Sequence, residues 1–234
     1  MKRAIVTGGG RGIGLAVAIA LCEAGYEVIA TGVDAAEVTA MPQVKGLSGR
    51  VLDVRDNDAI TALFNGLESL DALVNCAGLI RRGGAEYEIE TFADVIDINL
   101  NGMMRTCNAA KPLLAKTGGA IVNTASMLSF FGGPTVPAYT ASKGGVAQLT
   151  KALAVAWASE GIRINAVAPG WIATELTRPL VEDSARAEPI LSRTPMRRWG
   201  TPQDVAGPVV FLCSDAARFV TGIILPVDGG YASA

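Results

Sequence analysis

Three side chains between positions 126 and 143 could carry acid–base chemistry. Ser126 supplies a hydroxyl, Tyr139 a phenol, and Lys143 an amine one helical turn after the phenol. Residues four apart lie on one face of a helix, so a helix that begins near Tyr139 would direct phenol and amine into the same space. A nearby cation favours the phenolate, so we expect Lys143 to lower the pKa of Tyr139 towards that of a general base. The same triplet is also common in purely structural helices.

A glycine-rich loop near the amino terminus could hold a phosphate group. Residues 2–7 form a short run with β-branched residues that predicts a strand, and the loop from Gly8 to Gly14 follows directly. Residues 13–24 predict a buried helix, and residues 27–31 a second strand. Glycines permit a tight turn and a close approach of the backbone to a pyrophosphate at a helix N-terminus. This succession of elements is typical of a dinucleotide-binding unit.

The alternation of strands and helices continues along the chain. Further strands are predicted over residues 51–54, 72–76, 120–124, 163–167 and 223–227, and helices over residues 60–70, 92–110, 139–159 and 203–213. This order predicts an α/β fold with a Rossmann-type doubly wound parallel sheet of about seven strands, helices on both faces, and one domain over residues 1–234. Ligands of such sheets bind outside the carboxyl ends of the strands, where the candidate residues converge.

Composition argues against several classes of function. A formal net charge of -2 without a cluster of Lys or Arg argues against a nucleic-acid partner. No apolar run has membrane-spanning length and no leader sequence is apparent, so we expect a cytoplasmic chain without a membrane partner. The four cysteines are isolated and are expected to be free thiols. The absence of histidine rules out Ser-His-Asp catalysis, removes the commonest transition-metal ligand, and leads us to predict no metal site.

Taken together, these residues resemble the short-chain dehydrogenase/reductase family from end to end. The matching features are Thr7, Gly8, Gly12, Ile13, Gly14, Asn75, Ala77, Gly78, Asn99, Ser126, Tyr139, Lys143, Pro169, Gly170 and Asp228-Gly229-Gly230. Each feature is common by chance, whereas all of them in order along one chain form a specific signal. The resemblance implies an NAD(P)-dependent oxidoreductase that moves a hydride between nicotinamide and the carbon of an alcohol or ketone, acting on a small-molecule substrate.

The resemblance also implies roles for individual residues. Tyr139 would be the acid–base group, Lys143 would lower its pKa and hold the nicotinamide ribose, Ser126 would bind the substrate oxygen, and Asn99 would anchor a water in a proton relay. Besides Tyr139 and Lys143, the expected cofactor-binding residues are Gly8, Arg11, Gly12, Ile13, Gly14, Asp34, Asp53, Asn75, Ala77, Gly78, Pro169, Gly170, Ile172 and Thr174. Alternatively, Asn99 could bond the backbone, Asn75 could be a turn residue, and Asp53 could cap the following helix.

The choice between NAD and NADP depends on the residues after the second strand. Asp34 lies about 20 residues past the last glycine of the loop, the spacing expected of an acid that binds the ribose 2′-hydroxyl. Such an acid would repel a 2′-phosphate. Arg11 argues the other way, because many NADP-dependent relatives carry a basic residue at its position. We predict NAD as the cofactor.

The substrate prediction rests on a closer resemblance to the sugar-acid dehydrogenases of this family, those acting on 2-deoxy-D-gluconate and 2-dehydro-3-deoxy-D-gluconate. The matching stretches are residues 75–82, 125–130, 136–137 and 198–200. A hexonate carboxylate favours a guanidinium fork, and Arg81 follows the turn predicted to bind the cofactor. Alternatively, Arg81 and Arg82 are solvated surface charges or lie in a subunit interface. Residues 175–193 are a candidate lid.

Two other functions fit the same residues. One is an NADPH-dependent 3-oxoacyl-[acyl-carrier-protein]-type reductase, whose relatives often carry the basic residue seen here as Arg11. The other is a cofactor-binding regulator without catalysis, against which the complete set of Asn99, Ser126, Tyr139 and Lys143 argues. The resemblance further implies a homo-oligomer, usually a tetramer, and the Ala-rich helix expected after Tyr139 suits packing at an interface or on its own sheet.

Overall fold

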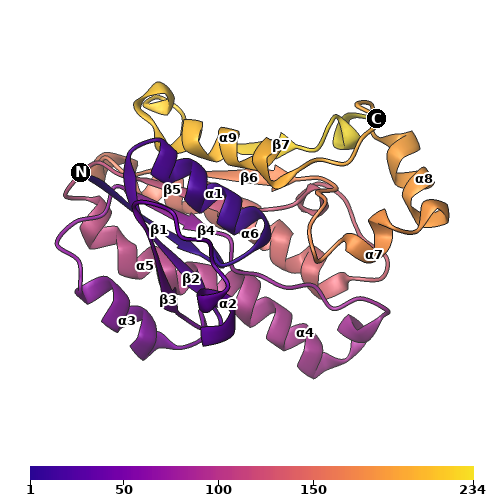
Figure 1. Cartoon of the computed structure of the whole chain (residues 1–234), viewed down its shortest axis with the longest axis horizontal. Coiled ribbons are helices and arrows are strands. Elements are labelled where there is room, and N and C mark those ends of the chain that lie inside the picture. The colour runs from indigo at the N-terminus through magenta and orange to yellow at the C-terminus, as the bar shows by residue number, and fades with distance from the viewer.

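All seven strands lie in one parallel sheet. The computed structural model describes residues 1–234, with the strands in the order β3-β2-β1-β4-β5-β6-β7 (Figure 1). They are β1 (Lys2–Thr7), β2 (Tyr26–Gly32), β3 (Leu47–Val51), β4 (Ala72–Asn75), β5 (Ala120–Thr124), β6 (Arg163–Pro169) and β7 (Ile224–Val227). The order reverses between β1 and β4, and a crevice at such a reversal is where doubly wound sheets bind their ligands.

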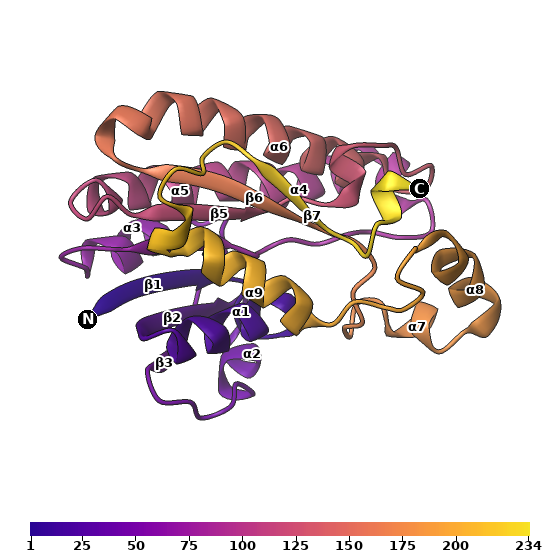
Figure 2. The same ribbon diagram turned by 90° about the horizontal axis from the view of Figure 1, so that it is seen from above.

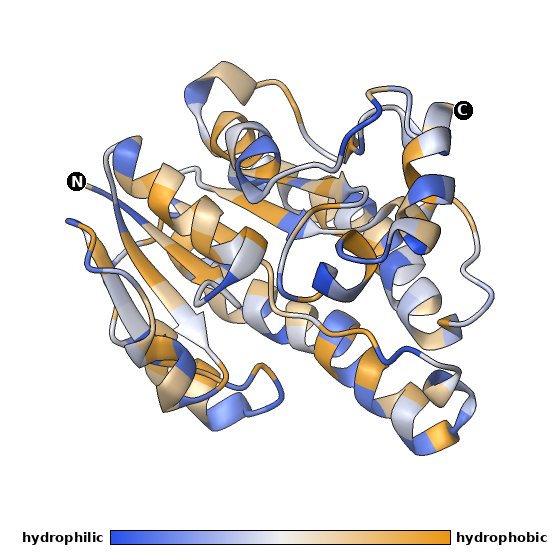
Figure 3. Cartoon of the chain, turned by 45° about the vertical axis from the view of Figure 1, so that its right-hand side comes forward, coloured by the Kyte–Doolittle hydropathy of each residue, from blue (hydrophilic) through white to orange (hydrophobic).

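Helices cover both faces of the sheet (Figure 2). On one face α1 (Gly12–Glu23) packs against α9 (Pro202–Cys213), and the other face is covered by α3 (Asn57–Asn65), α5 (Gly102–Leu114) and α6 (Pro137–Trp157). Ile5 and Val6, neighbours on β1, are both fully buried, one in each of the two cores. Apolar runs without alternation are what strands covered on two faces require. Figure 3 shows the hydrophobic colour along these strands.

The remaining helices follow the carboxyl ends of strands or precede α5. They are α2 (Ala35–Thr39) after β2, α4 (Ile89–Ile96), which continues through a π-helical turn into α5, and α7 (Arg178–Val181) with α8 (Ser184–Arg193). Figure 1 shows α7 and α8 projecting beyond the sheet on the side of the C-terminus. No helix of the structure combines the length and apolar character needed to cross a membrane.

The predicted fold class is confirmed, and the strands predicted over residues 2–7 and 120–124 coincide with β1 and β5. The third strand was predicted wrongly over residues 51–54, because β3 ends at Val51 and pairs along β2 from Leu47 onward. Its sequence contains Ser48, Gly49 and Arg50, which hide a strand from an apolar pattern. Glycine is needed at position 49, because a Cβ there would lie 2.6 Å from a side-chain carbon of Val38 on α2.

Two predicted helices have different bounds in the structure. The helix predicted over residues 60–70 is α3, which starts earlier because the Asp56 carboxylate accepts the N–H groups of Asp58 and Ala59 at 2.9 and 3.0 Å. The helix predicted over residues 92–110 is longer and interrupted, since α4 and α5 are joined by the π-helical turn Asp97–Asn101. No residue type in Asp97–Asn101 marks a π-helical turn, so the sequence did not reveal it.

Candidate active site

Ser126 lies just beyond the carboxyl end of β5 and is fixed by a capped turn. Its Oγ accepts the N–H of Leu128 at 3.2 Å, while the Ser126 N–H donates to Oγ of Ser129 at 3.3 Å. Ser129 Oγ in turn donates to the carbonyl of Lys143 on α6 at 2.6 Å. These bonds connect the predicted substrate-binding hydroxyl rigidly to the helix that carries the phenol and the amine.

Tyr139 and Lys143 lie on the first turns of α6, as the spacing predicted. The helix begins at Pro137, whose missing N–H costs nothing in the first turn. Lys143 is 4% exposed, its Nζ lies 5.5 Å from the centre of the Tyr139 ring, and it donates to the Thr124 carbonyl at 2.7 Å. The structure therefore brings phenol, amine and the end of β5 together.

The pKa values of this pair are set mainly by burial. Burial raises the pKa of Tyr139 above its ordinary value, and the hydrogen bond with Ser126 and the charge of Arg82 lower it by less. Burial also lowers the pKa of Lys143 to about 8. In this arrangement the ammonium of Lys143 is directed to the Thr124 carbonyl, and the lowering of the Tyr139 pKa by Lys143 stays a prediction.

A buried carboxylate, which the sequence did not reveal, supports Tyr139. Glu86 has no exposed surface, and its two oxygens accept the N–H of Tyr139 at 2.8 Å and the N–H of Arg81 at 2.9 Å. The N–H groups of the first turn of a helix have no partner within the helix, and a carboxylate is favoured there. Among charged neighbours in the sequence, Glu86 looks like a surface residue, so only the fold identifies it.

Asn99 lies in the π-helical turn and is fully buried. Its Oδ1 accepts the Leu79 N–H at 2.8 Å, and its Nδ2 donates to the Leu79 carbonyl at 2.9 Å and to Ser142 Oγ at 3.1 Å. The alternative in which Asn99 bonds the backbone is thus present in the structure. A Cβ on Gly78 would lie 3.1 Å from Asn99 Oδ1 and 3.7 Å from Lys143 Nζ, so a glycine is what lets these groups approach.

The glycine loop and α1 form a cradle that suits a pyrophosphate. Arg11 is the N-cap of α1 and makes no side-chain capping bond, so the first N–H groups of the helix receive no partner from this cap and remain available to an anion. Gly12 has φ of 55°, and a Cβ there would lie 3.8 Å from Thr174. The structure therefore brings the predicted Gly8 to Gly14 loop and Thr174 together at the N-terminus of α1.

The turns after β4 and β6 border the same crevice. Thr7 Oγ1 accepts the Ala77 N–H at 3.3 Å, which holds the turn from Asn75 to Gly78 beside the glycine loop. After β6, a Cβ on Gly170 would lie 2.6 Å from the Cβ of Asp228, and the Asp228 carboxylate accepts N–H groups of the C-terminal turn. Ile172 is buried and bridges to Gly200.

Three predicted cofactor-binding side chains have other partners in the structure. Asn75 is 2% exposed, donates to Asn123 Oδ1 at 2.9 Å and accepts from Thr106 at 2.8 Å, so its amide ties β4 to β5 and α5. Asp34 caps α2 by accepting the Glu37 N–H at 2.8 Å. Asp53 pairs with Arg55 at 2.7 Å, and this hydrogen bond lowers the pKa of Asp53. The alternative of Asp53 as a helix cap is wrong, since Asp56 caps α3.

The two arginines after Gly78 have different neighbours. Arg81, the predicted substrate residue, has its Nη2 3.7 Å from Asp94 Oδ2. Arg82 lies close enough to Tyr139 for its charge to lower the pKa of the phenol. Partial burial lowers the pKa of Arg82, and the charge of Arg186 on α8 adds to this effect. Arg82 therefore places a guanidinium group near the phenol, Arg186 lies near Arg82, and Arg81 is directed to Asp94.

The candidate lid contains two helices that the sequence did not reveal. Asp183 caps α8 by accepting the Ala185 N–H at 3.0 Å. At the end of α8, the Arg193 guanidinium lies 4.3 Å from the ring centre of Tyr231 and 5.2 Å from that of Phe131. These cation–π contacts attach the end of α8 to the C-terminal turn and to the loop after Ser126.

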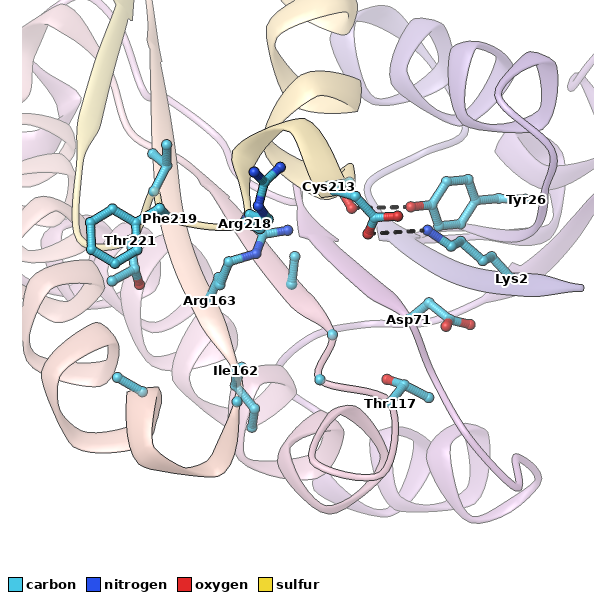
Figure 4. A pocket seen from close by; sticks show the side chains of 17 residues that line it. Lys2, Tyr26, Asp71, Thr117, Ile162, Arg163, Cys213, Arg218, Phe219 and Thr221 are labelled. Carbon is cyan, nitrogen blue, oxygen red and sulfur yellow. Dashed lines mark hydrogen bonds and ion pairs between the residues drawn. The ribbon is translucent and has the colours of Figure 1, made fainter.

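A hollow of about 650 Å³ opens at the opposite, amino ends of the strands (Figure 4). Several of its polar groups are already bonded to one another or to the backbone. Lys2 lies 3.7 Å from Asp215, Tyr26 donates to the Cys213 carbonyl at 3.1 Å, and Arg163 donates to a carbonyl at 2.7 Å. It contains none of the residues predicted to do chemistry.

Comparison with known proteins identifies the family. Residues 8–232 match a family model described as Enoyl-(Acyl carrier protein) reductase. The chain is 43% identical over 244 residues to the 2-dehydro-3-deoxy-D-gluconate 5-dehydrogenase of Pseudoalteromonas atlantica, across 98% of this chain and 95% of the relative. This chain belongs to the short-chain dehydrogenase/reductase family. It is also 44% identical over 243 residues to the Bacillus subtilis protein of the same name, across 99% of this chain and 95% of that relative.

A solved structure confirms the fold of this short-chain dehydrogenase/reductase. A gluconate 5-dehydrogenase from Burkholderia cenocepacia, in complex with NADP and tartrate, matches with a TM-score of 0.93 at 36% identity, across 100% of this chain and 96% of that chain. The predicted family and enzyme class are thus confirmed. This short-chain dehydrogenase/reductase is a nicotinamide-dependent oxidoreductase that acts on CH–OH groups.

Proposed function

We propose that this enzyme is an NAD-dependent dehydrogenase of a sugar acid or related polyol, with Tyr139 as its acid–base group. The observation that carries the proposal is the meeting of Ser126, Tyr139 and Lys143 at the carboxyl end of β5. Ser126 lies close enough to the phenol to lower the pKa of Tyr139, and Lys143 donates to the Thr124 carbonyl at the end of that strand. The names of the relatives, which act on gluconate and on 2-dehydro-3-deoxy-D-gluconate, support the substrate class.

The roles of the residues follow from their positions. A nicotinamide bound in the crevice supplies the hydride acceptor. As the alcohol is oxidised, Tyr139 Oη takes the hydroxyl proton, and Ser126 Oγ holds the oxygen that loses it. The Lys143 ammonium lies one turn away, where it stabilises the phenolate and can hold the nicotinamide ribose. Asn99 holds the turn at Gly78 and anchors a water that passes the proton on.

The carboxylate of the substrate is best matched by Arg82. A sugar acid bound with its reacting carbon at Tyr139 brings its carboxylate towards the cation near the phenol, which is Arg82, and Arg186 of α8 lies near Arg82. Arginine can bind a carboxylate through two parallel hydrogen bonds. The Asp94 partner of Arg81 makes Arg81 the weaker candidate.

A second candidate is an NADPH-dependent 3-oxoacyl-thioester reductase. The acyl-carrier description of the matching family model and the basic residue Arg11 favour it. Against it, the Nε of Arg11 lies 3.7 Å from the Glu37 carboxylate, which weakens its attraction for a phosphate.

We further propose that the enzyme is a cytoplasmic homotetramer whose chain folds as one domain. The support for assembly is the apolar surface of α6, where Val155 is 84% exposed. Sedimentation or light scattering of the purified protein tests the oligomeric state, and a monomer at micromolar concentration would contradict it.

The test of function is a panel of substrates with NAD, monitored by reduced-nicotinamide absorbance. Expected substrates are D-gluconate and 2-dehydro-3-deoxy-D-gluconate, with an uncharged hexitol as comparison and an acetoacetyl thioester with NADPH as the competing reaction. Arg82→Gln should raise KM for the acids by about 10-fold or more, the effect of losing a hydrogen bond to a charged group, and should leave KM for the hexitol unchanged. Arg81→Gln is the matched control. Reduction of the thioester alone would favour the second candidate.

A further inference from the structure

The Glu37 side chain lies over the glycine loop at the adenosine end of the crevice. A Cβ on Gly10 would lie 2.6 Å from Glu37 Cγ and 2.8 Å from its Oε1, and a Cβ on Gly32 would lie 3.0 Å from the same Cγ. Two glycines, one in the loop and one at the end of β2, therefore leave room for this side chain. Figure 1 shows α2, which carries Glu37, beside the end of β2.

The Glu37 carboxylate is held there by two partners. Its Oε2 accepts the Val33 N–H at 3.2 Å, and its Oε1 lies 3.7 Å from Arg11 Nε. The Glu37 side chain is 14% exposed, whereas that of Arg11 is 74% exposed. The carboxylate thus belongs to the wall of the crevice, and Arg11 reaches it from the solvent side.

Asp34, the acid that the spacing suggested, binds the backbone of Glu37 and not the crevice. The Asp34 carboxylate accepts the Glu37 N–H at 2.8 Å and so fixes the start of α2. One acid therefore orients the short helix, and the other faces the glycine loop. The spacing rule identified the correct segment but the wrong residue, Asp34 in place of Glu37. Spacing alone cannot distinguish a residue that caps a helix from one that binds the ribose.

The chemistry of a carboxylate at this place decides between the two coenzymes. In a doubly wound sheet the loop after β1 holds the pyrophosphate, and an acid after β2 receives the adenosine ribose. A carboxylate only accepts hydrogen bonds, so it suits the ribose 2′-hydroxyl, which can donate one. A 2′-phosphate would bring a second negative group against a carboxylate that is mostly removed from solvent. We propose that Glu37 selects NAD over NADP, an inference that rests on the nicotinamide-dependent activity proposed above.

Because Arg11 lies beside Glu37, a single substitution of Glu37 should move the coenzyme preference from NAD towards NADP. With Glu37 in place, the guanidinium is partly neutralised by its 3.7 Å neighbour. Without that negative charge, the Arg11 guanidinium is a cationic donor that no carboxylate neutralises, and a phosphate favours such a donor. The preference therefore depends on the charge of Glu37 more than on the shape of the crevice.

The test is binding of NADH and NADPH, measured separately by reduced-nicotinamide fluorescence in the wild type and in Glu37→Gln. Wild type should bind NADH more tightly. Glu37→Gln keeps the size and the bond from Val33 and removes the charge, so the ratio of the two dissociation constants should move towards NADPH by about 10- to 100-fold. Glu27→Gln makes the same charge change on the exposed surface of β2 and should leave the ratio unmoved.

Three results would overturn the inference: a wild type that prefers NADPH, an unchanged ratio in Glu37→Gln, or an equal shift produced by Asp34→Ser, which keeps a capping oxygen. Other results would contradict the proposed function and can be distinguished from these three. If neither coenzyme binds, both proposals fall. If the ratio shifts as expected while hexonates are not oxidised, the role of Glu37 stands and the substrate assignment falls.

Discussion

The two ends of the crevice are built in contrasting ways. At the catalytic end, Lys143 is 4% exposed, and bonds from Thr124, Ser129 and Glu86 fix α6 to segments far away in the sequence. At the adenosine end, Arg11 is 74% exposed, and Glu37 is held mainly by residues close to it in the chain. Contacts from several distant segments fix the side chains of the catalytic end, whereas two or three mostly local contacts fix those of the adenosine end. Substitutions should therefore stop the reaction at one end and change coenzyme preference at the other.

The largest effect at the catalytic end is expected for Lys143→Met, apart from loss of the phenol itself. Removing the ammonium that assists proton transfer should lower kcat by about 10²- to 10⁴-fold. The same substitution should increase the free energy of unfolding, because it removes an amine that is desolvated in the folded chain. Burial holds the pKa of Lys143 at about 8 in the folded chain against 10.5 for a free lysine, so the unfolded state binds more protons between these values.

The stability of wild type relative to Lys143→Met should therefore rise with pH from 8 to 10.5, by roughly 3 kcal/mol at most. Urea unfolding of the two proteins across this range measures the difference. Subtracting the variant removes the other titrating groups, such as Tyr26, whose pKa burial raises to about 12. A difference independent of pH would mean that Lys143 is not desolvated as the structure indicates.

A smaller effect is expected for the buried carboxylate that supports Tyr139. The negative charge of Glu86 raises the pKa of Tyr139, so Glu86→Gln should shift the pH profile of kcat/KM to lower pH. Glu86→Ala also removes the acceptor of two N–H groups and should cost about 1–3 kcal/mol for each group left unpaired. The exposed Glu88 supplies the control, Glu88→Gln. An unshifted profile in Glu86→Gln would reduce Glu86 to a structural residue.

The smallest effect on stability is expected at the adenosine end. Arg11→Gln removes an exposed partner of Glu37, and exposed pairs contribute little, so the free energy of unfolding should change by no more than about 0.5 kcal/mol. In the Glu37→Gln background the same change should remove most of the gained NADPH affinity. If Arg11→Gln destabilised the fold as strongly as Glu86→Ala, the contrast between the two ends would be lost.

The sequence predicted the catalytic end better than the adenosine end, for a physical reason. Ser126, Tyr139 and Lys143 sit at a strand end and on one helix face, and periodicity reveals both. Glu86 and Glu37 owe their positions to tertiary contacts, which no spacing reports. The short α2 and the glycine-containing β3 carry too few apolar residues to show a pattern, so the segment that decides between the coenzymes was the hardest to interpret.

The measurement that tests the account most directly is the turnover of Tyr139→Phe on a hexonate with NAD, beside its affinity for NADH. The substitution removes one oxygen and leaves the ring and α6 in place. We expect kcat to fall by about 10²- to 10⁴-fold with NADH binding nearly unchanged, because only the proton acceptor is lost. Retention of most of the wild-type turnover would contradict the central claim that this phenol moves the proton.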